Sequence, residues 1–294
     1  MKEIHHVPVL VDQVLRLLDL GPGMTVADLT VGTGGHAQVL AEKIGEGGLL
    51  YAVDQDEEAL RIAEERLRNA PCRVVFIHAN FRHLRTFIPE RALDACLADL
   101  GLSSLQVDSP GRGFSFRHEG PLDMRMDPAS SGWTAADAVN RLPEERLAEI
   151  LRTYGEEPFA RRIAREIVAR RSKKPLTTTG DLVDAVWAAM PPGRRRRHPA
   201  RRTFQALRIF VNDELAALEE MLSVLPRCLK PGGRCAVISF HSLEDRIVKR
   251  TFAHPPWSPL TKKPIVPSAH EVERNPRARP AKLRAAVLGR FEGE

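Results

Sequence analysis

The sequence predicts an α/β fold in which a parallel sheet, covered by helices on both faces, is interrupted by a mostly helical insertion. Three observations support this prediction. Short apolar runs alternate with amphipathic helical patterns from residue 24 to about residue 101. Strand signals stop from residue 106 to residue 212, where helical patterns follow one another. After residue 213 the first pattern resumes, so the sheet domain is expected to be discontinuous in sequence.

The first part of the chain predicts the order β-α-β-α-β-α-β. Its apolar runs are TVADL (25–29), LLYAV (49–53), RVVFI (73–77) and ACLADL (95–100). Helical patterns begin at about Ala37 and Glu57, and a shorter one follows the third run. Runs without polar alternation are typical of strands buried on both faces, as in a parallel sheet with right-handed crossovers.

The insertion, residues 106–212, contains four helical patterns. They are DAVNRLPEERLAEILRTY, RRIAREIVARR, DLVDAVWAAM and RRTFQALRIFV. The sequence Thr179-Gly180-Asp181 supplies a cap for the third helix, and Pro191-Pro192-Gly193 ends it, because proline cannot donate the next helical hydrogen bond. We therefore divide the chain into residues 1–105, 106–212 and 213–294.

The last part of the chain predicts a return to the sheet. DELAALEEMLSVLPRCL predicts a helix, KPGG a turn and RCAVISF a strand. The segment from His254 to Pro280 is rich in proline and charge, so we expect it to wind over the surface. KLRAAVLGRF predicts a final strand at the edge of the sheet.

Positive charge is concentrated in one stretch of the chain. The 294 residues carry a net charge of +6, but residues 161–202 alone hold 13 Lys and Arg against 3 Asp and Glu. A local basic surface suggests a polyanionic partner, because lysine and arginine release counterions from phosphates. A solvated helix face is the alternative interpretation.

Several classes of protein are excluded by composition. Hydrophobic residues make up 43% of the chain, which is too many for a disordered protein, and no apolar run is long enough to span a bilayer. We therefore expect a cytoplasmic protein. The four cysteines form no C-x-x-C pair and lie in or beside apolar stretches, which predicts buried thiols with neither a disulfide nor a metal site.

A glycine-rich loop, Gly32-Thr33-Gly34-Gly35-His36-Ala37, joins the first predicted strand to the first helix. Such a loop brings backbone N–H groups close to a ligand. Asp54 ends the second strand, where a carboxylate can accept the hydroxyl groups of an adenosyl ribose. This order predicts an adenosyl cofactor, and as a pattern it also fits NAD.

Three features favour S-adenosylmethionine over NAD. Asp28, four positions before the first glycine, suits a cationic amino group and would repel a pyrophosphate. The turn Leu229-Lys-Pro-Gly-Gly233 before the resumed strand is similar to one that recurs in class I methyltransferases. Tyr51 and Tyr154 are the only tyrosines, and neither precedes a lysine at the spacing of a short-chain dehydrogenase.

Residues that follow the strands are expected to line the site, because ligands of open α/β sheets bind beyond the carboxyl ends of the strands. Phe81 follows the third strand and either stacks on the adenine or is a core aromatic. Asp99 follows the fourth strand, where it or Ser103 could accept the hydrogens of a substrate amine. His241 follows the resumed strand, and a structural hydrogen-bonding role is favoured over a role as base.

Long motifs in this chain resemble those of the RsmH (MraW) family of bacterial 16S rRNA cytosine-N4 methyltransferases. The resemblance runs from HVPVL near the N-terminus to the last strand. The motifs are ADLGLSSLQVDSPGRGFSFRHEGPLDMRMD, YGEEPFARRIAR, TFQALRIFVNDEL, ISFHSLEDRIVK and NPRARPAKLR. The resemblance implies a class I (Rossmann-like) methyltransferase sheet with an inserted, mostly helical domain that recognises rRNA. It also implies methyl transfer from S-adenosylmethionine to a cytidine amine in the decoding centre, at the P site, of 16S rRNA within the small ribosomal subunit.

The resemblance also implies roles for individual residues around the cofactor. His36 and Gln106 enter on the resemblance alone, whereas the others were also reached as loop or strand-end positions. Ala37, Val107 and Pro280 depart from the family pattern, and none is an implied cofactor contact. The implied cofactor-binding residues are Gly34, Gly35, His36, Asp54, Phe81, Asp99 and Gln106.

Two segments are candidates for contact with RNA. The segment from Arg112 to Asp127 is polar and rich in glycine and proline, so we expect either a substrate-side loop that presents Arg125 or a structural Ω-loop. The run Arg194, Arg195, Arg196 and Arg197 lies in a loop without apolar residues, which favours contact with phosphates over reading of bases.

Two other functions remain open at this point. One is an NAD-dependent oxidoreductase. The other is a non-catalytic assembly factor that binds the small subunit and retains the pocket for stability. The intact glycine loop, Asp54, Phe81 and Asp99 favour an active methyltransferase with Asp99 as its candidate catalytic residue.

Overall fold

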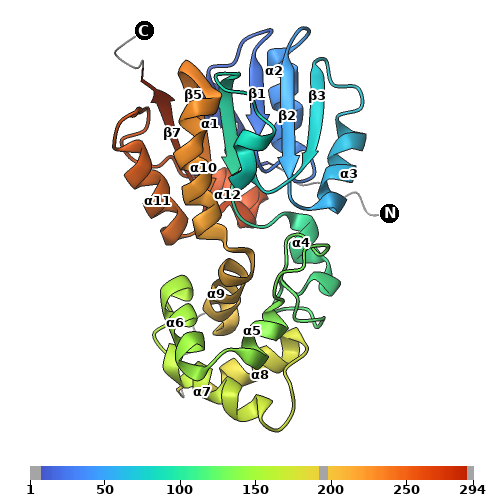
Figure 1. The fold of residues 1–294 in the computed structure, drawn as a ribbon, viewed down its shortest axis with the longest axis vertical. Helices are drawn as coiled ribbons and strands as arrows, with labels where there is room; N and C mark the ends of the chain where they lie inside the picture. The colour runs from blue at the N-terminus through green and yellow to red at the C-terminus, as the bar shows by residue number, and fades with distance from the viewer. Residues whose placement is uncertain (1–7, 192–197, 290–294) are drawn as a thin grey trace. The chain divides into compact units, whose positions relative to one another are not determined.

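The computed structural model describes residues 8–191 and 198–289 and divides the chain into two compact units. The core unit comprises Met1–Ser103 and Leu215–Glu294, and the helical unit comprises Ser104–Glu214. Figure 1 labels most of the helices and strands of the two units.

The core unit contains, in its described part, a seven-stranded sheet with the order β3-β2-β1-β4-β5-β7-β6. The pairs among β1 to β5 are parallel, and β7 is antiparallel to both of its neighbours. This arrangement confirms the predicted Rossmann-like α/β class. The strands are β1 (Thr25–Asp28), β2 (Leu49–Asp54), β3 (Arg73–His78), β4 (Leu93–Asp99), β5 (Leu229–Ser239), β6 (Trp257–Pro259) and β7 (Lys282–Leu288).

Helices cover both faces of this sheet. Alternate residues of a strand point to opposite faces, so Ala95 and Leu97 of β4 pack in one cluster while Cys96 and Ala98 pack in the other. One face is covered by α1 (Val11–Leu18), α2 (Gly35–Ile44) and α3 (Glu57–Arg66). The other is covered by η1 (Phe81–Thr86), α10 (Glu214–Cys228) and α11 (Ser242–Phe252). The chain also forms α12 (Ala269–Arg274) and η3 (Pro276–Ala278) before β7.

Two predictions about the C-terminal part were wrong. The last strand, β7, is not at the edge, because it pairs with β5 on one side and with β6 on the other. The edge strand is β6, a short strand in the segment that was expected to wind over the surface and that is mostly exposed; a strand that contains Pro259 suits an edge. The second error is KPGG, which is not a turn before the strand but a bulge within β5, between the pairs Leu93↔Leu229 and Ala95↔Arg234.

The helical unit is built from α4 (Ser104–Asp108), η2 (Pro110–Arg112) and the five helices α5 (Ala135–Arg141), α6 (Glu144–Gly155), α7 (Ala160–Arg171), α8 (Thr179–Ala189) and α9 (Ala200–Asn212) in its described part. The first helical pattern is split into α5 and α6, because Pro143 forces the preceding Leu142 into an extended conformation. The cap of α8 is Thr178, one residue before the predicted position, in a reciprocal pair with Asp181.

Cysteine burial agrees with the sequence prediction at three of the four positions. Cys96, Cys228 and Cys235 are buried, whereas Cys72 is half-buried, and all four thiols are free. Among the described helices, none has the length and apolar character needed to cross a membrane.

An ion pair ties β7 to α11. The Arg284 guanidinium donates to Asp245 Oδ1 at 2.7 Å, and the Lys282 ammonium donates to Asp245 Oδ2 at 3.2 Å. The Arg284 and Asp245 side chains are 8% and 13% exposed. Burial by itself would raise the pKa of Asp245, but the bonds from Arg284 and Lys282 lower it below its usual value.

We predict that D245N lowers the free energy of unfolding by about 3 kcal/mol at pH 7, because a buried arginine loses its charged partner. The folded pKa of Asp245 is depressed, so this contribution is present above the unfolded value of about 4 and is lost as pH falls through the folded value. Urea unfolding at pH 7 and pH 3 measures both. The matched control is D19N, which removes the exposed partner of Arg234 and should cost less than about 1 kcal/mol.

Candidate cofactor site

The loop between β1 and α2 is shaped by two glycines in left-handed conformations. Gly32 and Gly34 have φ angles of +51° and +85°, which other residues adopt at a cost. A Cβ on Gly34 would also lie 3.4 Å from the Cα of Ala63 on α3. The helix α2 then begins at Gly35. The first N–H groups of a helix have no partner within it, so this end is suited to an anionic or polar ligand group.

The carboxylate of Asp54 lies beside this loop, at the carboxyl end of β2. It accepts hydrogen bonds from the N–H of Gly32 at 2.8 Å and from the N–H of Asp56 at 2.9 Å. Burial raises the pKa of Asp54 to about 6, although these two bonds favour the charged form. The structure thus brings the glycine loop and its predicted acidic partner together.

Asp28, His36 and Asp99 form a second cluster of titratable groups. His36 Nδ1 lies 3.4 Å from Asp99 Oδ2, and His36 Nε2 lies 2.8 Å from the carbonyl oxygen of Val9. The ring is 5% exposed, and both of its nitrogens face protein groups. The ring nitrogens of His36 are therefore already engaged by protein groups, and contact between His36 and the cofactor stays a prediction.

Two carboxylate oxygens of this cluster are buried without a hydrogen-bond partner among the described residues: Asp28 Oδ2 and Asp99 Oδ1. Burial raises the pKa of Asp28 to about 7, with His36 opposing the change, and raises the pKa of Asp99 to about 8, with a further contribution from Glu244. Unpaired buried carboxylate oxygens are costly unless a ligand supplies donors or positive charge. The cluster therefore fits a cationic ligand.

Phe81 is the first residue of η1 and is partly buried against the core cluster on the α10 face. That packing is what a core aromatic would show, and stacking on adenine stays a prediction. The preceding Asn80 caps η1 through the N–H of Arg82 and donates to the side chain of Gln55 at 2.9 Å. Gln106 belongs to the helical unit, where it is buried in α4.

Arg125 is held within the segment that the sequence marked as a loop. Its guanidinium donates twice to the Asp123 carboxylate, at 2.8 Å each, and once to the carbonyl of Ser130 at 2.8 Å. Leu122, Met124 and Met126 are buried, as their alternation with polar residues indicated. These contacts support the structural Ω-loop interpretation, and contact of Arg125 with RNA stays a prediction. Arg194, Arg195, Arg196 and Arg197 lie outside the described residues.

His241 has a structural role, as the sequence favoured. It caps α11: its Nδ1 accepts from the N–H of Glu244 at 3.3 Å, while the Glu244 carboxylate accepts from the N–H groups of Phe240 and His241. Sequence reasoning missed Thr30, whose hydroxyl oxygen accepts from the N–H of Asp99 at 2.6 Å, and Val9, which holds His36. No local pattern marks either contact, because the partners are far apart in the chain.

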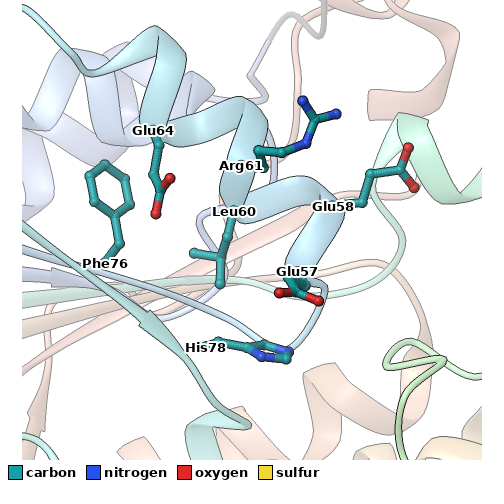
Figure 2. Close-up of a pocket in the computed structure, with 7 residues that line it drawn as sticks. All are labelled: Glu57, Glu58, Leu60, Arg61, Glu64, Phe76 and His78. Carbon is teal, nitrogen blue, oxygen red and sulfur yellow. The ribbon is translucent and has the colours of Figure 1, made fainter.

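A surface pocket lies between α3 and β3 (Figure 2). Acidic side chains of α3 share it with Arg61, Phe76 and His78. Its lining is Glu57, Glu58, Leu60, Arg61, Glu64, Phe76 and His78. None of the cofactor-binding residues implied by the sequence lines this pocket.

We predict that D99N stabilises the ligand-free protein, more so at high pH. The folded pKa of Asp99 is about 8 and the unfolded value is about 4, so the folded state loses stability as pH rises from about 4 and carries the full penalty above pH 8. The D99N amide carries no charge, so the gain should be near zero at pH 4 and on the order of 3 kcal/mol at pH 9. Denaturant unfolding at both pH values measures it, and an equal gain at both would contradict the assignment.

Comparison with known proteins places the chain in a family. A family model described as the MraW methylase family matches residues 3–288. A protein named ribosomal RNA small subunit methyltransferase H from Heliobacterium modesticaldum is 48% identical over 96% of this chain and 98% of its own length. A protein of the same name from Sorangium cellulosum is 50% identical over 96% of this chain and 90% of its own. Among solved structures, a putative methyltransferase from Streptococcus mutans in complex with SAH has a TM-score of 0.48 at 12% identity and covers 96% of this chain and 99% of its own. The match over nearly the whole chain shows that this protein belongs to the MraW methylase family.

Proposed function

We propose that this protein transfers a methyl group from S-adenosylmethionine to the exocyclic N4 amine of a cytidine in the decoding centre, at the P site, of 16S rRNA. As a member of its family, the chain is an S-adenosylmethionine-dependent methyltransferase of small-subunit ribosomal RNA. The choice of cytidine, the N4 atom, the assembled small subunit as partner and the cytoplasm as location are the parts that we propose.

The observation that carries this proposal is the set of three carboxylates, Asp28, Asp54 and Asp99, at the carboxyl ends of three adjacent strands. S-adenosylmethionine offers a ribose diol, an ammonium and a sulfonium, and it has no phosphate. Carboxyl groups at these positions favour such a cation, which would lower their raised pKa values, and in their charged form they repel a pyrophosphate. The same observation argues against an NAD-dependent oxidoreductase.

The residues present fit this cofactor. We assign the ribose hydroxyls to Asp54, which lies beside the glycine loop, and we assign a donor role to the N–H groups of Gly35 and His36 at the start of α2. We assign the orphaned oxygens of Asp28 and Asp99 to positive charge and to N–H donors. The cofactor supplies a methyl group that its sulfonium has already activated. What remains for the protein is to orient the amine, exclude water and accept one proton.

We assign rRNA recognition to the helical unit. In α7, Ile163, Ala164 and Ile167 are buried, whereas Arg161, Arg162 and Arg165 are exposed. Exposed arginines on one helix can contact phosphates without reading bases. The second candidate function, a small-subunit assembly factor without catalysis, shares this surface and differs only in the absence of methyl transfer.

We predict that the pure protein, incubated with methyl-labelled S-adenosylmethionine and unmodified small subunits, places the label in N4-methylcytidine. Naked 16S rRNA, tested in parallel, should accept less label if the folded particle is recognised. Nucleoside digestion and chromatography identify the product. Cofactor and ribosome binding without labelled nucleoside would favour the assembly factor, and label in another nucleoside would overturn the cytidine assignment.

The variant D54A should weaken the binding of S-adenosylmethionine, measured by calorimetry, by about 10-fold to 100-fold, because it removes a charged acceptor.

We also predict that the triple variant R161Q/R162Q/R165Q binds small subunits more weakly and with a flatter dependence on salt. Each lost phosphate contact should reduce the slope of log K against log salt by about 0.7. A matched variant, R61Q/R68Q/R73Q, removes three exposed arginines of the core unit and should leave the slope unchanged. Equal slopes for the α7 variant and the unmodified protein would contradict contact between α7 and RNA.

A further inference from the structure

His36 has a single neutral form that fits its surroundings. Its Nε2 lies 2.8 Å from the carbonyl oxygen of Val9, and a carbonyl can only accept, so Nε2 carries the hydrogen. The neutral ring therefore presents the lone pair of Nδ1 to Asp99 Oδ2, 3.4 Å away. A lone pair and a carboxylate oxygen repel each other at this distance unless a proton lies between them.

Burial disfavours a charge on either His36 or Asp99, although other carboxyl groups lie near both side chains. His36 faces the carboxylates of Asp28, Asp99 and Glu271, and Asp99 faces His36, Glu244 and Asp28. Burial lowers the pKa of His36, although Asp28, the Val9 carbonyl and Glu271 oppose the change, whereas burial raises the pKa of Asp99 to about 8. At neutral pH these shifts favour a proton on Asp99, and Nδ1 of His36, 3.4 Å from Asp99 Oδ2, is the nearest acceptor for it.

A short segment near the N-terminus, residues 8–10, fixes the orientation of the His36 ring; we call it the strap. Pro8 lies against Gly35, where an added Cβ would be 3.4 Å from the proline ring, and Val9 offers its carbonyl to His36. The next N–H in the strap, that of Leu10, donates to Glu271 Oε1 on α12 at 2.7 Å, across 261 positions of sequence. Glu271 thus fixes the position of the strap, and the Val9 carbonyl in the strap determines which ring nitrogen of His36 carries the hydrogen.

We propose that His36 is a positioning residue that relays a proton through Asp99, and that Glu271 keeps it in the required tautomer. The relay rests on the proposed methylation of an amine. When the amine nitrogen bonds to the methyl carbon, the S–C electron pair returns to sulfur and the nitrogen holds a surplus proton. That proton passes to Asp99 Oδ1 while its N–H electron pair stays on nitrogen, and the proton on Asp99 Oδ2 moves to Nδ1 of His36.

The geometry supports each end of this relay. Asp99 Oδ1 is buried and has no partner among the described residues, so it is available to the amine. After transfer the pair holds one more proton, and the positive charge lies on the His36 ring, which faces the carboxylate of Asp28. Loss of that proton to solvent returns the pair to its starting state. Without His36, Asp99 would have to be ionised before it could accept a proton.

The test is the pH dependence of kcat for H36Q on small subunits. The glutamine amide of H36Q can donate to the Val9 carbonyl in place of Nε2–H, but it is not basic. Since the pKa of Asp99 is about 8, H36Q should lose about 10-fold in kcat at pH 7 and recover above pH 9. Its Kd for S-adenosylmethionine, measured by calorimetry, should stay within about threefold. The matched control is H78Q, whose ring Nε2 also meets a carbonyl, that of Gln55 at 3.0 Å, and whose pH profile should not change.

A loss in H36Q that is equal at every pH, or no loss, would overturn the relay. The tautomer is tested without any reaction, by nitrogen chemical shifts of labelled histidine. We expect His36 to be neutral at pH 7 with its hydrogen on Nε2, and a hydrogen on Nδ1 would overturn the proposal. If this tautomer is found but no cytidine amine is methylated, the proposed function fails while the proton-sharing pair stands.

A second set of variants leaves His36 untouched. E271A removes the acceptor that holds Leu10, so it should produce mixed His36 tautomers and lower kcat at pH 7. E271Q keeps a side-chain oxygen that can accept from Leu10 and should restore both. E273A, on the exposed side of the same helix, is the control. If E271A keeps the single Nε2–H tautomer and full kcat, Glu271 has no positioning role.

Discussion

The site depends on one constraint: in a parallel sheet, strands that lie side by side end at the same edge. The order β2-β1-β4 is therefore what brings Asp54, Asp28 and Asp99 together, although they are far apart in the chain. The glycine loop follows β1, the middle strand of the three, and contacts Asp54 through the N–H of Gly32. Crossover connections between parallel strands thus assemble the loop and all three carboxylates.

Burial of these three carboxylates costs stability. The raised pKa values of Asp28, Asp54 and Asp99 mean that folding disfavours their charged forms at neutral pH. A cationic ligand that brings its own donors would offset this penalty, and we propose that affinity and specificity for the cofactor arise from the same electrostatics. A protein optimised only for stability would replace these groups with neutral ones.

Much of the fold was accessible from pattern alone. Continuous apolar runs predicted the parallel strands, and glycines with a later aspartate predicted the cofactor loop. The errors came where pairing partners are distant: β7 was assigned to an edge, although β6 covers it, and KPGG was assigned to a turn, although it is a bulge against β4. Local composition describes a segment, whereas its neighbours in a sheet depend on the rest of the chain.

The sequence by itself determined the fold class and the family, and it named the candidate residues of the site. Only the tertiary structure decided what those residues face. In the folded chain the His36 ring contacts Val9 and Asp99, and Arg125 donates to Asp123 and Ser130. Glu271, on α12, accepts a hydrogen bond from Leu10 of the strap. Residue type limits which bonds a side chain can make, but burial and long-range packing select one of them, and protonation states follow from that choice.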